Sequence, residues 1–251
     1  MAVNNTDPNN NMEDISSFAV NNNRPSKKVV FNTASAKDYV TSEAYKTLRT
    51  NLFFCGNDVK TILITSCREN EGKSTVSTEL AKSLAENGKK ALLIDADMRK
   101  SVMLKKRNIH AVEILGLSEI LSGMCSVDEA LYHTQLDGFD VIFSGPFPPN
   151  PVELIGSGNL EKLLNGLKKE YDYIIIDSPP LAQVIDAAVI AACCDGAILV
   201  INNRKTSRRI AENVKQQLQK SGCRLLGAVL NETEKGPAYS RNKYYGQYTY
   251  K

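Results

Sequence analysis

The sequence predicts an α/β fold of the doubly wound type, with a mainly parallel sheet that carries helices on both faces. Short, nearly continuous apolar segments alternate along the chain with segments of helical periodicity. A loop containing Gly-Lys-Ser follows one apolar segment and precedes a helical one, which is the local order of a phosphate-binding loop. Two further apolar segments end in aspartate, and open parallel sheets bind ligands at such strand ends.

Helices are predicted where apolar residues recur every three or four positions. In 41–55 such a stripe follows Thr41 or Ser42, either of which can cap the helix. Two further helices end at Gly88 and near Gly222, because glycine commonly terminates a helix. The three stripes are Ala44, Leu48 and Leu52; Val76, Leu80 and Leu84; and Ile210, Val214 and Leu218.

Strands are predicted at the short apolar segments, none of which reaches the roughly 18 residues that a membrane helix needs. Buried strands joined by helices favour a parallel sheet covered on both faces. The predicted strands are 61–65, 91–94, 141–143, 173–176, 197–201 and 226–230.

The composition excludes several classes of protein. A chain of 251 residues with 42% hydrophobic and 24% charged residues has the balance of a globular protein. Its net charge of +3 does not suggest nucleic-acid binding. The six cysteines form no C-x-x-C pair, which favours reduced thiols over a disulfide or zinc framework. The N-terminus lacks the pattern of a secretory signal, so a cytoplasmic protein is expected.

The two ends of the chain differ in composition from its middle. Residues 1–36 are rich in asparagine and show no periodicity, which predicts a flexible arm. Residues 37–235 carry the predicted strands and helices and form the expected folded domain. Residues 236–251 hold five of the ten tyrosines and almost no aliphatic residue, which predicts a mobile tail.

The strongest signal for chemistry is the loop CRENEGKST at 67–75. In a phosphate-binding loop, backbone N–H groups and a helix N-terminus face an anion, a lysine neutralises the β- and γ-phosphates, and a hydroxyl binds Mg²⁺. Lys73 and Ser74 occupy these places, although Cys67 stands where the general pattern has glycine. The alternative is a chance lysine at a helix start. The predicted nucleotide-binding residues here are Asn70, Glu71, Gly72, Lys73, Ser74 and Thr75.

Carboxylates at the ends of two predicted strands give the second and third signals. LLIDADMR places Asp95 and Asp97 on one side at a strand end, and YIIIDSPP places Asp177 at another. One carboxylate could activate a nucleophile while another holds Mg²⁺. A rival interpretation makes Asp95 the ribose-binding acid of a dinucleotide fold, but the required G-x-G-x-x-G is missing.

With these motifs the sequence resembles the bacterial tyrosine kinases of capsule and exopolysaccharide synthesis, in the cytoplasmic form that depends on a separate membrane protein. The resemblance runs from Tyr39 to the C-terminus and includes GPFPPNPVELI at 145–155 and the terminal tyrosines. It implies a P-loop NTPase fold shared with partitioning and cell-division-site ATPases, and ATP and Mg²⁺ as cofactors. It also implies autophosphorylation that regulates polysaccharide synthesis and export, at Tyr239, Tyr244, Tyr245, Tyr248 and Tyr250.

The resemblance implies a role for each matched residue of the site. Lys73 and Ser74 would bind phosphate and Mg²⁺, and Asp177 would help to hold the metal. Asp95 would accept the proton of the tyrosine hydroxyl and also contact the metal, and Asp97 would support it as a second catalytic carboxylate.

Other positions depart from the family pattern or carry a weaker match. The family's self-association motif E-x-x-R-x-x-R appears as Glu43, Lys46 and Arg49, and the lysine keeps the charge but loses bidentate geometry. Glu69 stands where the family often has proline. Asn231 resembles a nucleotide-binding position near adenine in related ATPases, although a strand-end asparagine is otherwise a turn former.

The resemblance also implies partners. These are a membrane-anchored activator whose cytoplasmic tail completes the nucleotide site, a ring of identical subunits and a cognate tyrosine phosphatase. The chain would be cytoplasmic and peripheral at the inner face of the membrane through its activator. The tail carries Arg241, Lys243 and Lys251, and each phosphate would add about −1.5 to −2 charges, so phosphorylation is expected to favour ring disassembly.

Two other functions stay open on the residues. A partitioning- or cell-division-site ATPase would hydrolyse ATP with water and typically has lysine where Arg68 stands, but it leaves the tyrosine tail unexplained. A non-catalytic nucleotide-binding regulator would not need the full set of lysine, serine and aspartates. The tail itself could instead be an aromatic patch that binds a partner or a membrane surface.

Overall fold

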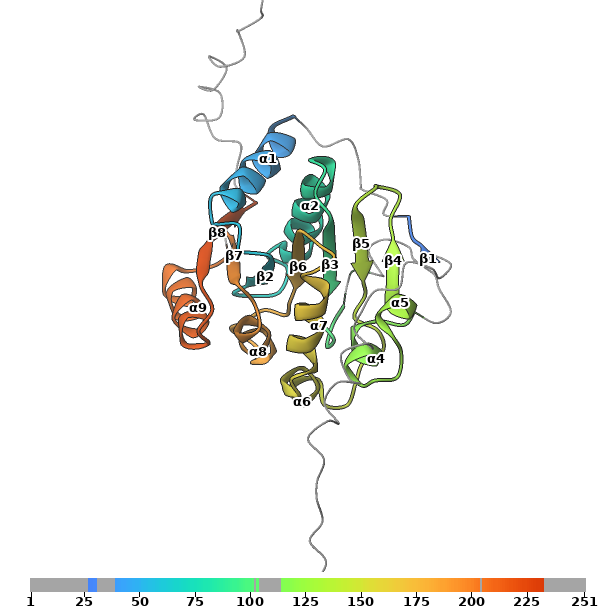
Figure 1. The fold of residues 1–251 in the computed structure, drawn as a ribbon. Coiled ribbons are helices and arrows are strands. Elements are labelled where there is room, and N and C mark those ends of the chain that lie inside the picture. Colours follow the sequence, from blue (N-terminus) through green and yellow to red (C-terminus); the bar gives the residue numbers. More distant parts are fainter. Residues whose placement is uncertain (1–26, 31–38, 102, 104–113, 204, 233–251) are drawn as a thin grey trace, which may run out of the picture.

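The fold is built on one eight-stranded sheet (Figure 1). The computed structural model describes residues 27–30, 39–101, 103, 114–203 and 205–232. The strand order is β1-β4-β5-β3-β6-β2-β7-β8, and every neighbouring pair is parallel except β4 with β5. The strands are β1 (Lys27–Lys28), β2 (Thr61–Ser66), β3 (Ala91–Asp95), β4 (Leu131–His133), β5 (Phe139–Ile142), β6 (Tyr173–Asp177), β7 (Gly196–Asn202) and β8 (Leu225–Asn231).

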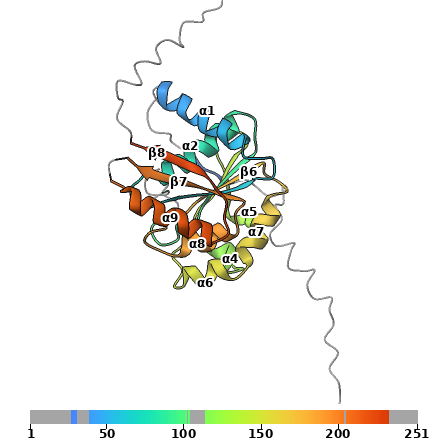
Figure 2. The ribbon, with the colours of Figure 1, turned by 90° about the vertical axis from the view of Figure 1, so that its left-hand side faces the viewer.

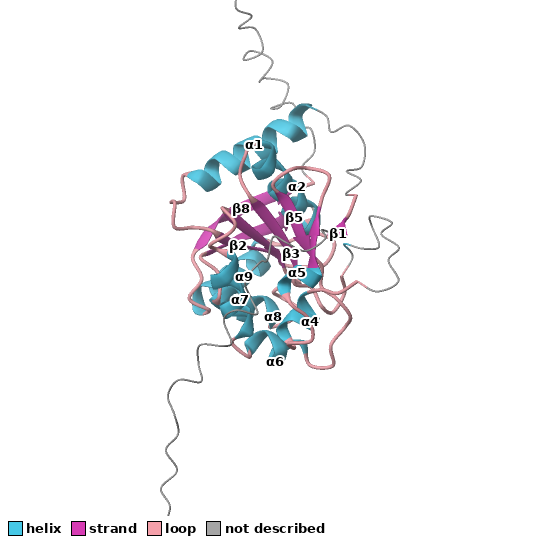
Figure 3. Cartoon of the chain, turned by 45° about the vertical axis from the view of Figure 1, so that its right-hand side comes forward, coloured by secondary structure: helices cyan, strands magenta, loops and turns pink. Residues whose placement is uncertain are grey.

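Helices cover both faces of this sheet and make three layers (Figure 3). One face packs against α1 (Tyr39–Phe53) and α2 (Lys73–Glu86). The helices on the other face are α4 (Leu117–Leu121), α5 (Val127–Ala130), α6 (Pro151–Gly156), α7 (Asn159–Leu167), α8 (Asp186–Ala192) and α9 (Arg208–Lys220). Each face has its own apolar core, and β2 and β3 are buried along their whole length. The predicted doubly wound α/β fold is confirmed.

The structure corrects some predicted elements. Helix α1 begins at Tyr39, so Thr41 and Ser42 lie inside the helix and do not cap it. Ala44 is exposed, and Leu52 is the buried residue of that stripe. The prediction also missed β4, which has only three residues, and the short helices α4 to α8, whose four to nine residues give little periodicity.

Both edges of the sheet are made by strands near the ends of the described chain. Lys27 and Lys28 of β1 pair in parallel with β4, and Val29 is buried beside them. These residues belong to the arm predicted for 1–36, most of which lies outside the described residues. Strand β8 forms the opposite edge, between α1 above and α9 below (Figure 2).

The parallel strands β2, β3 and β6 lie side by side at the centre of the sheet, and their carboxyl ends meet. All three predicted motifs lie at these strand ends and in the loops that follow them. No helix in the described part of the chain is long and apolar enough to cross a membrane.

Candidate active site

The loop between β2 and α2 has the backbone shape of a phosphate-binding loop. Helix α2 begins directly after it, at Lys73, so the helix N-terminus faces the same space as the loop. Gly72 has φ 91°, in the left-handed region that favours glycine. A Cβ atom at Gly72 would also clash with the side-chain amide of Asn231. The conformation therefore requires glycine at this position.

The buried side chain of Glu71 stabilises the phosphate-binding loop by hydrogen bonds. Its fully buried carboxylate accepts hydrogen bonds at Oε2 from the backbone N–H of Cys67 (2.7 Å) and of Arg68 (2.9 Å). Its Oε1 accepts a hydrogen bond from the hydroxyl of Thr206, in the loop between β7 and α9. Asn231 Nδ2 donates to the carbonyl oxygen of Glu71 at 2.9 Å. The phosphate-binding loop, the β7–α9 loop and the end of β8 are thus tied together behind the predicted phosphate site.

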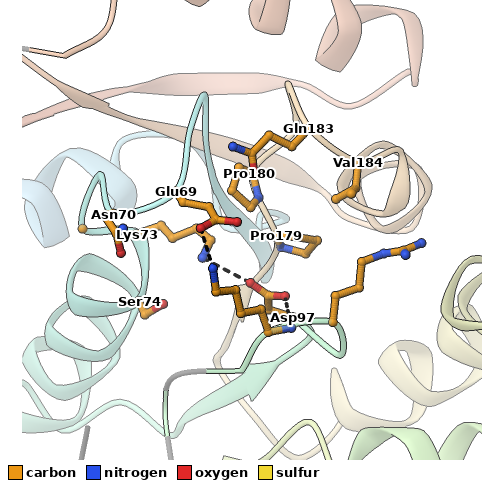
Figure 4. Close-up of a pocket in the computed structure, with 12 residues that line it drawn as sticks. Glu69, Asn70, Lys73, Ser74, Asp97, Pro179, Pro180, Gln183 and Val184 are labelled. Carbon is orange, nitrogen blue, oxygen red and sulfur yellow. Dashed lines mark hydrogen bonds and ion pairs between the residues drawn. The ribbon is translucent and has the colours of Figure 1, made fainter. Parts of the chain in front are cut away.

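A cleft opens in front of this loop (Figure 4). Lys73 Nζ lies 3.3 Å from Asp97 Oδ2 within it, and both side chains are nearly buried. Of the predicted nucleotide-binding residues, Glu71, Thr75 and Asn231 do not border the cleft. The cleft is lined by Glu69, Asn70, Gly72, Lys73, Ser74, Asp97, Arg99, Lys100, Pro179, Pro180, Gln183 and Val184.

Asp95 and Asp177 lie side by side beneath the cleft, because they are paired residues at the ends of β3 and β6. Both are almost fully buried. Ser77 Oγ donates to Asp177 at 3.1 Å, and the Ser74 hydroxyl also bonds to Asp177. Ser101 Oγ donates to Asp95 Oδ2 at 2.5 Å, and the N–H of Asp97 donates to Asp95 Oδ1 at 3.1 Å. Two carboxyl groups are therefore held together away from water.

This pair is electrostatically unfavourable when both groups are charged. Burial, and then the neighbouring Asp177, raise the pKa of Asp95 to about 8. Burial also raises the pKa of Asp177, although Lys73 and the Ser74 and Ser77 hydroxyls oppose that rise. A divalent cation would relieve the repulsion, so the residues present fit Mg²⁺. The described residues hold no group of three or more His, Cys, Asp or Glu that could bind a metal by themselves.

Two ion pairs fix the rim of the cleft. Lys100 Nζ lies 2.7 Å from Glu69 Oε2 and joins the β3 loop to the phosphate-binding loop. Arg99 binds the carboxylate of Asp186 with two hydrogen bonds, of 2.7 and 3.1 Å, at the start of α8. Asp186 is buried, so this bond anchors the β3 loop to the helix layer. Ser101, Asp186 and Thr206 belong to no motif and were not predicted as site residues.

The predicted self-association residues lie on α1, away from the cleft. Lys46 Nζ pairs with Glu43 Oε1 at 2.8 Å on the exposed surface. Arg49 turns toward α2 and donates to the carbonyl oxygen of Ser83 at 2.7 Å. The predicted phosphorylation sites Tyr239 to Tyr250 lie outside the described residues.

Comparison with known proteins agrees with this geometry. Residues 59–221 match the family described as AAA domain. The tyrosine-protein kinase CpsD of Streptococcus agalactiae is 42% identical over 198 residues, which make up 79% of this chain and 86% of the relative. The chain belongs to the family of bacterial tyrosine-protein kinases. Among the functions that the sequence left open, this finding confirms the kinase.

Solved structures show the same relationship in three dimensions. The kinase is similar to the kinase domain of the Escherichia coli tyrosine kinase ETK, with a TM-score of 0.74, 29% identity and coverage of 89% of each chain. It is also similar to the septum site-determining protein MinD of Pyrococcus horikoshii, complexed with Mg-ADP. That comparison has a TM-score of 0.60 and 25% identity, and covers 73% of this chain and 76% of the other. The ATPase and kinase alternatives therefore share one fold.

Proposed function

We propose that this kinase transfers the γ-phosphoryl group of Mg-ATP to the tyrosine cluster at 239–250, and that this modification regulates capsular or exopolysaccharide synthesis and export. The observation that carries the proposal is the convergence of Lys73, Ser74 and Asp97 with the buried Asp95 and Asp177 at one edge of the sheet. Phosphoryl transfer needs mainly positioning and neutralisation of charge, and these residues supply both.

Each residue would contribute one part of the reaction. Lys73 would leave Asp97 and neutralise the β- and γ-phosphates, and the Ser74 hydroxyl and Asp177 would hold Mg²⁺, with Asp95 as a further ligand. Bound Mg²⁺ would supply positive charge to the phosphates and would favour the ionised forms of Asp95 and Asp177. As the new O–P bond forms and the bond to ADP breaks, the tyrosine proton would pass to Asp95, supported by Asp97.

The rest of the nucleotide would extend toward the ends of β7 and β8. In doubly wound sheets the ligand crosses the carboxyl ends of the strands, and Thr206 and Asn231 stand there behind Glu71. We propose that Glu71 contributes to nucleotide binding by shaping the loop, because its carboxylate is already bonded to Cys67 and Arg68.

The proposed organisation follows the composition of the chain. An arm of residues 1–36 precedes a kinase domain of 37–235, and residues 236–251 supply the acceptors. The proposed partners are a membrane-anchored activator, a cognate phosphatase and further copies of the chain, which would contact one another through Glu43, Lys46 and Arg49. The chain would act at the inner face of the membrane through its activator.

The test is mapping of phosphotyrosine by mass spectrometry after incubation with Mg-ATP and the cytoplasmic segment of the activator. Wild type, Lys73→Met and Lys82→Met are compared, and Lys82 is a matched control on the same helix whose side chain pairs with Glu86. We expect phosphate on Tyr239 to Tyr250 in wild type and Lys82→Met only. ATP consumption without phosphotyrosine in any protein would support an ATPase instead.

A further inference from the structure

A second groove, lined by both polar and apolar side chains, adjoins the active-site cleft. It lies between the start of the phosphate-binding loop, the loop that follows β6, and helix α9. Gln183 lines both the cleft and the groove, and Arg68 of the groove directly precedes Glu69 of the cleft. The two hollows therefore adjoin at Gln183 and at the start of the phosphate-binding loop.

The groove presents side-chain amides at a regular spacing. Asn213 and Gln217 are one helical turn apart on α9, next to the buried Val214 and Leu218 that attach the helix to the core. Both are exposed, and no hydrogen bond joins either side chain to another described residue. Four residues of helix advance by about 6 Å, which is close to the advance of about 6.6 Å over two residues of an extended chain. The two amides can therefore bond successive backbone groups on one side of an extended peptide.

We propose that this groove binds, in extended conformation, the stretch of residues 236–251 that flanks the tyrosine being phosphorylated, through backbone hydrogen bonds to Asn213 and Gln217. The inference rests on the proposed function and adds to it the surface that receives the acceptor. A tyrosine in the cleft would then continue past Gln183 into the groove.

The composition of 236–251 favours recognition through the backbone. Its five tyrosines are adjacent or two to five residues apart. Five different residue types precede them and five different types follow them, so they share no flanking motif. A pocket selective for one particular flanking side chain would place only one of these tyrosines in the cleft. Side-chain amides that bond the backbone can hold the residues that flank any of the tyrosines, because each residue other than proline presents the same N–H and C=O groups.

Photo-crosslinking in the full-length chain tests the occupant of the groove. Ala182 is exposed and lines the groove on the wall opposite α9, so Ala182→p-benzoylphenylalanine places a probe there. The protein is irradiated with Mg²⁺ and a non-hydrolysable ATP analogue, with and without the activator segment, and crosslinked peptides are identified by mass spectrometry. We expect crosslinks to residues 236–251.

Two double variants then test the role of the amides. Asn213→Ala/Gln217→Ala is expected to lower the crosslink yield to 236–251 by about threefold or more, because two hydrogen bonds are lost. Gln216→Ala/Gln219→Ala, on the same helix but outside the groove, should leave the yield unchanged. Equal yields in wild type and the first variant, or an equal loss in the control, would overturn the proposal.

Crosslinks only to the activator segment would also overturn it, because they would assign the groove to that partner. The readout requires no phosphoryl transfer. Its failure is therefore distinguishable from failure of the proposed kinase reaction, which the phosphotyrosine map measures separately.

Discussion

Lys73 Nζ and Asp97 Oδ2 lie 3.3 Å apart in the active-site cleft, with side chains only 11% and 8% exposed. The lysine that is expected to meet the phosphates of ATP is therefore already paired with a carboxylate. On the proposed mechanism, nucleotide binding would exchange one anionic partner of Lys73 for another and would free Asp97 as the phosphates arrive.

The pair predicts a non-additive effect on stability. Lys73→Met leaves Asp97 buried without its partner and is expected to destabilise the fold by about 3 kcal/mol. Lys73→Met/Asp97→Asn should be less destabilised than the sum of the two single variants, because neither charge then remains. Urea denaturation of the three variants measures this coupling, and strict additivity would contradict it.

The carboxyl pair Asp95 and Asp177 predicts a pH-dependent stability in the absence of metal. Because the folded protein raises the pKa of Asp95 to about 8, folding retains a proton that the unfolded chain releases near pH 4, and stability falls as pH rises between these values. Asp95→Asn should reduce this dependence and gain about 3–4 kcal/mol over wild type at pH 8 relative to pH 5, and the buried Asp177 should retain a smaller dependence of its own. Denaturation across this range checks it, with the exposed Asp137→Asn as control.

Asp95→Asn is also expected to slow phosphoryl transfer strongly. Loss of a proton acceptor that also contacts the metal should lower the initial rate by about 100-fold or more. Asp97→Asn should also lower the rate, and the ratio of the two effects shows which carboxylate accepts the proton. A near-normal rate for Asp95→Asn would reject its proposed role.

The bond between Thr206 and Glu71 predicts that the β7–α9 loop supports nucleotide binding. Thr206→Val removes the hydroxyl that reaches the buried carboxylate and is expected to weaken binding of Mg-ADP by about tenfold, because the phosphate-binding loop loses a brace. Isothermal titration calorimetry measures the affinity. Thr206→Ser keeps the hydroxyl and should stay within about twofold of wild type, and equal affinities for Thr206→Val and Thr206→Ser would refute the coupling.

The lowered pKa of Asp195 predicts that the folded protein loses stability in acid. Burial alone would raise its pKa, but hydrogen bonds from Lys168, Thr61 and Lys60 outweigh burial and lower the pKa overall. The stabilisation is therefore present above about pH 4 and is lost as pH falls through the lower folded value. Asp195→Asn should destabilise the protein by about 1–3 kcal/mol at pH 7 and by less at pH 3. Thermal denaturation at the two values measures the difference, and an equal effect at both would contradict it.

The sequence predicted those parts of the molecule that local patterns encode. The loop around Lys73 has a strand before it and a helix after it, and Asp95 and Asp177 end apolar strands, so their place at one edge of the sheet follows from topology. The pairing of Asp95 with Asp177 needs only the further knowledge that β3 and β6 are neighbours.

The remaining contacts join residues far apart in the chain. Thr206 reaches Glu71 across 135 positions, and Arg99 meets Asp186 across 87. No periodicity or spacing relates such pairs, because they form only when separate loops pack against one another. For the same reason the pairing of β1 with β4 could not be predicted from the composition of the arm.

Asn231 ends the last strand and touches the phosphate-binding loop itself. The first tail tyrosine, Tyr239, follows eight residues later, a span of at most about 29 Å in an extended chain. The proposed acceptors are thus tethered close to the point where the donor phosphate is expected to bind, and a short tether can give a local concentration of about millimolar, independent of how much protein is present. On the proposed function, any other tyrosine substrate would compete with these tethered tyrosines, and phosphorylation of the tail would remove that competition.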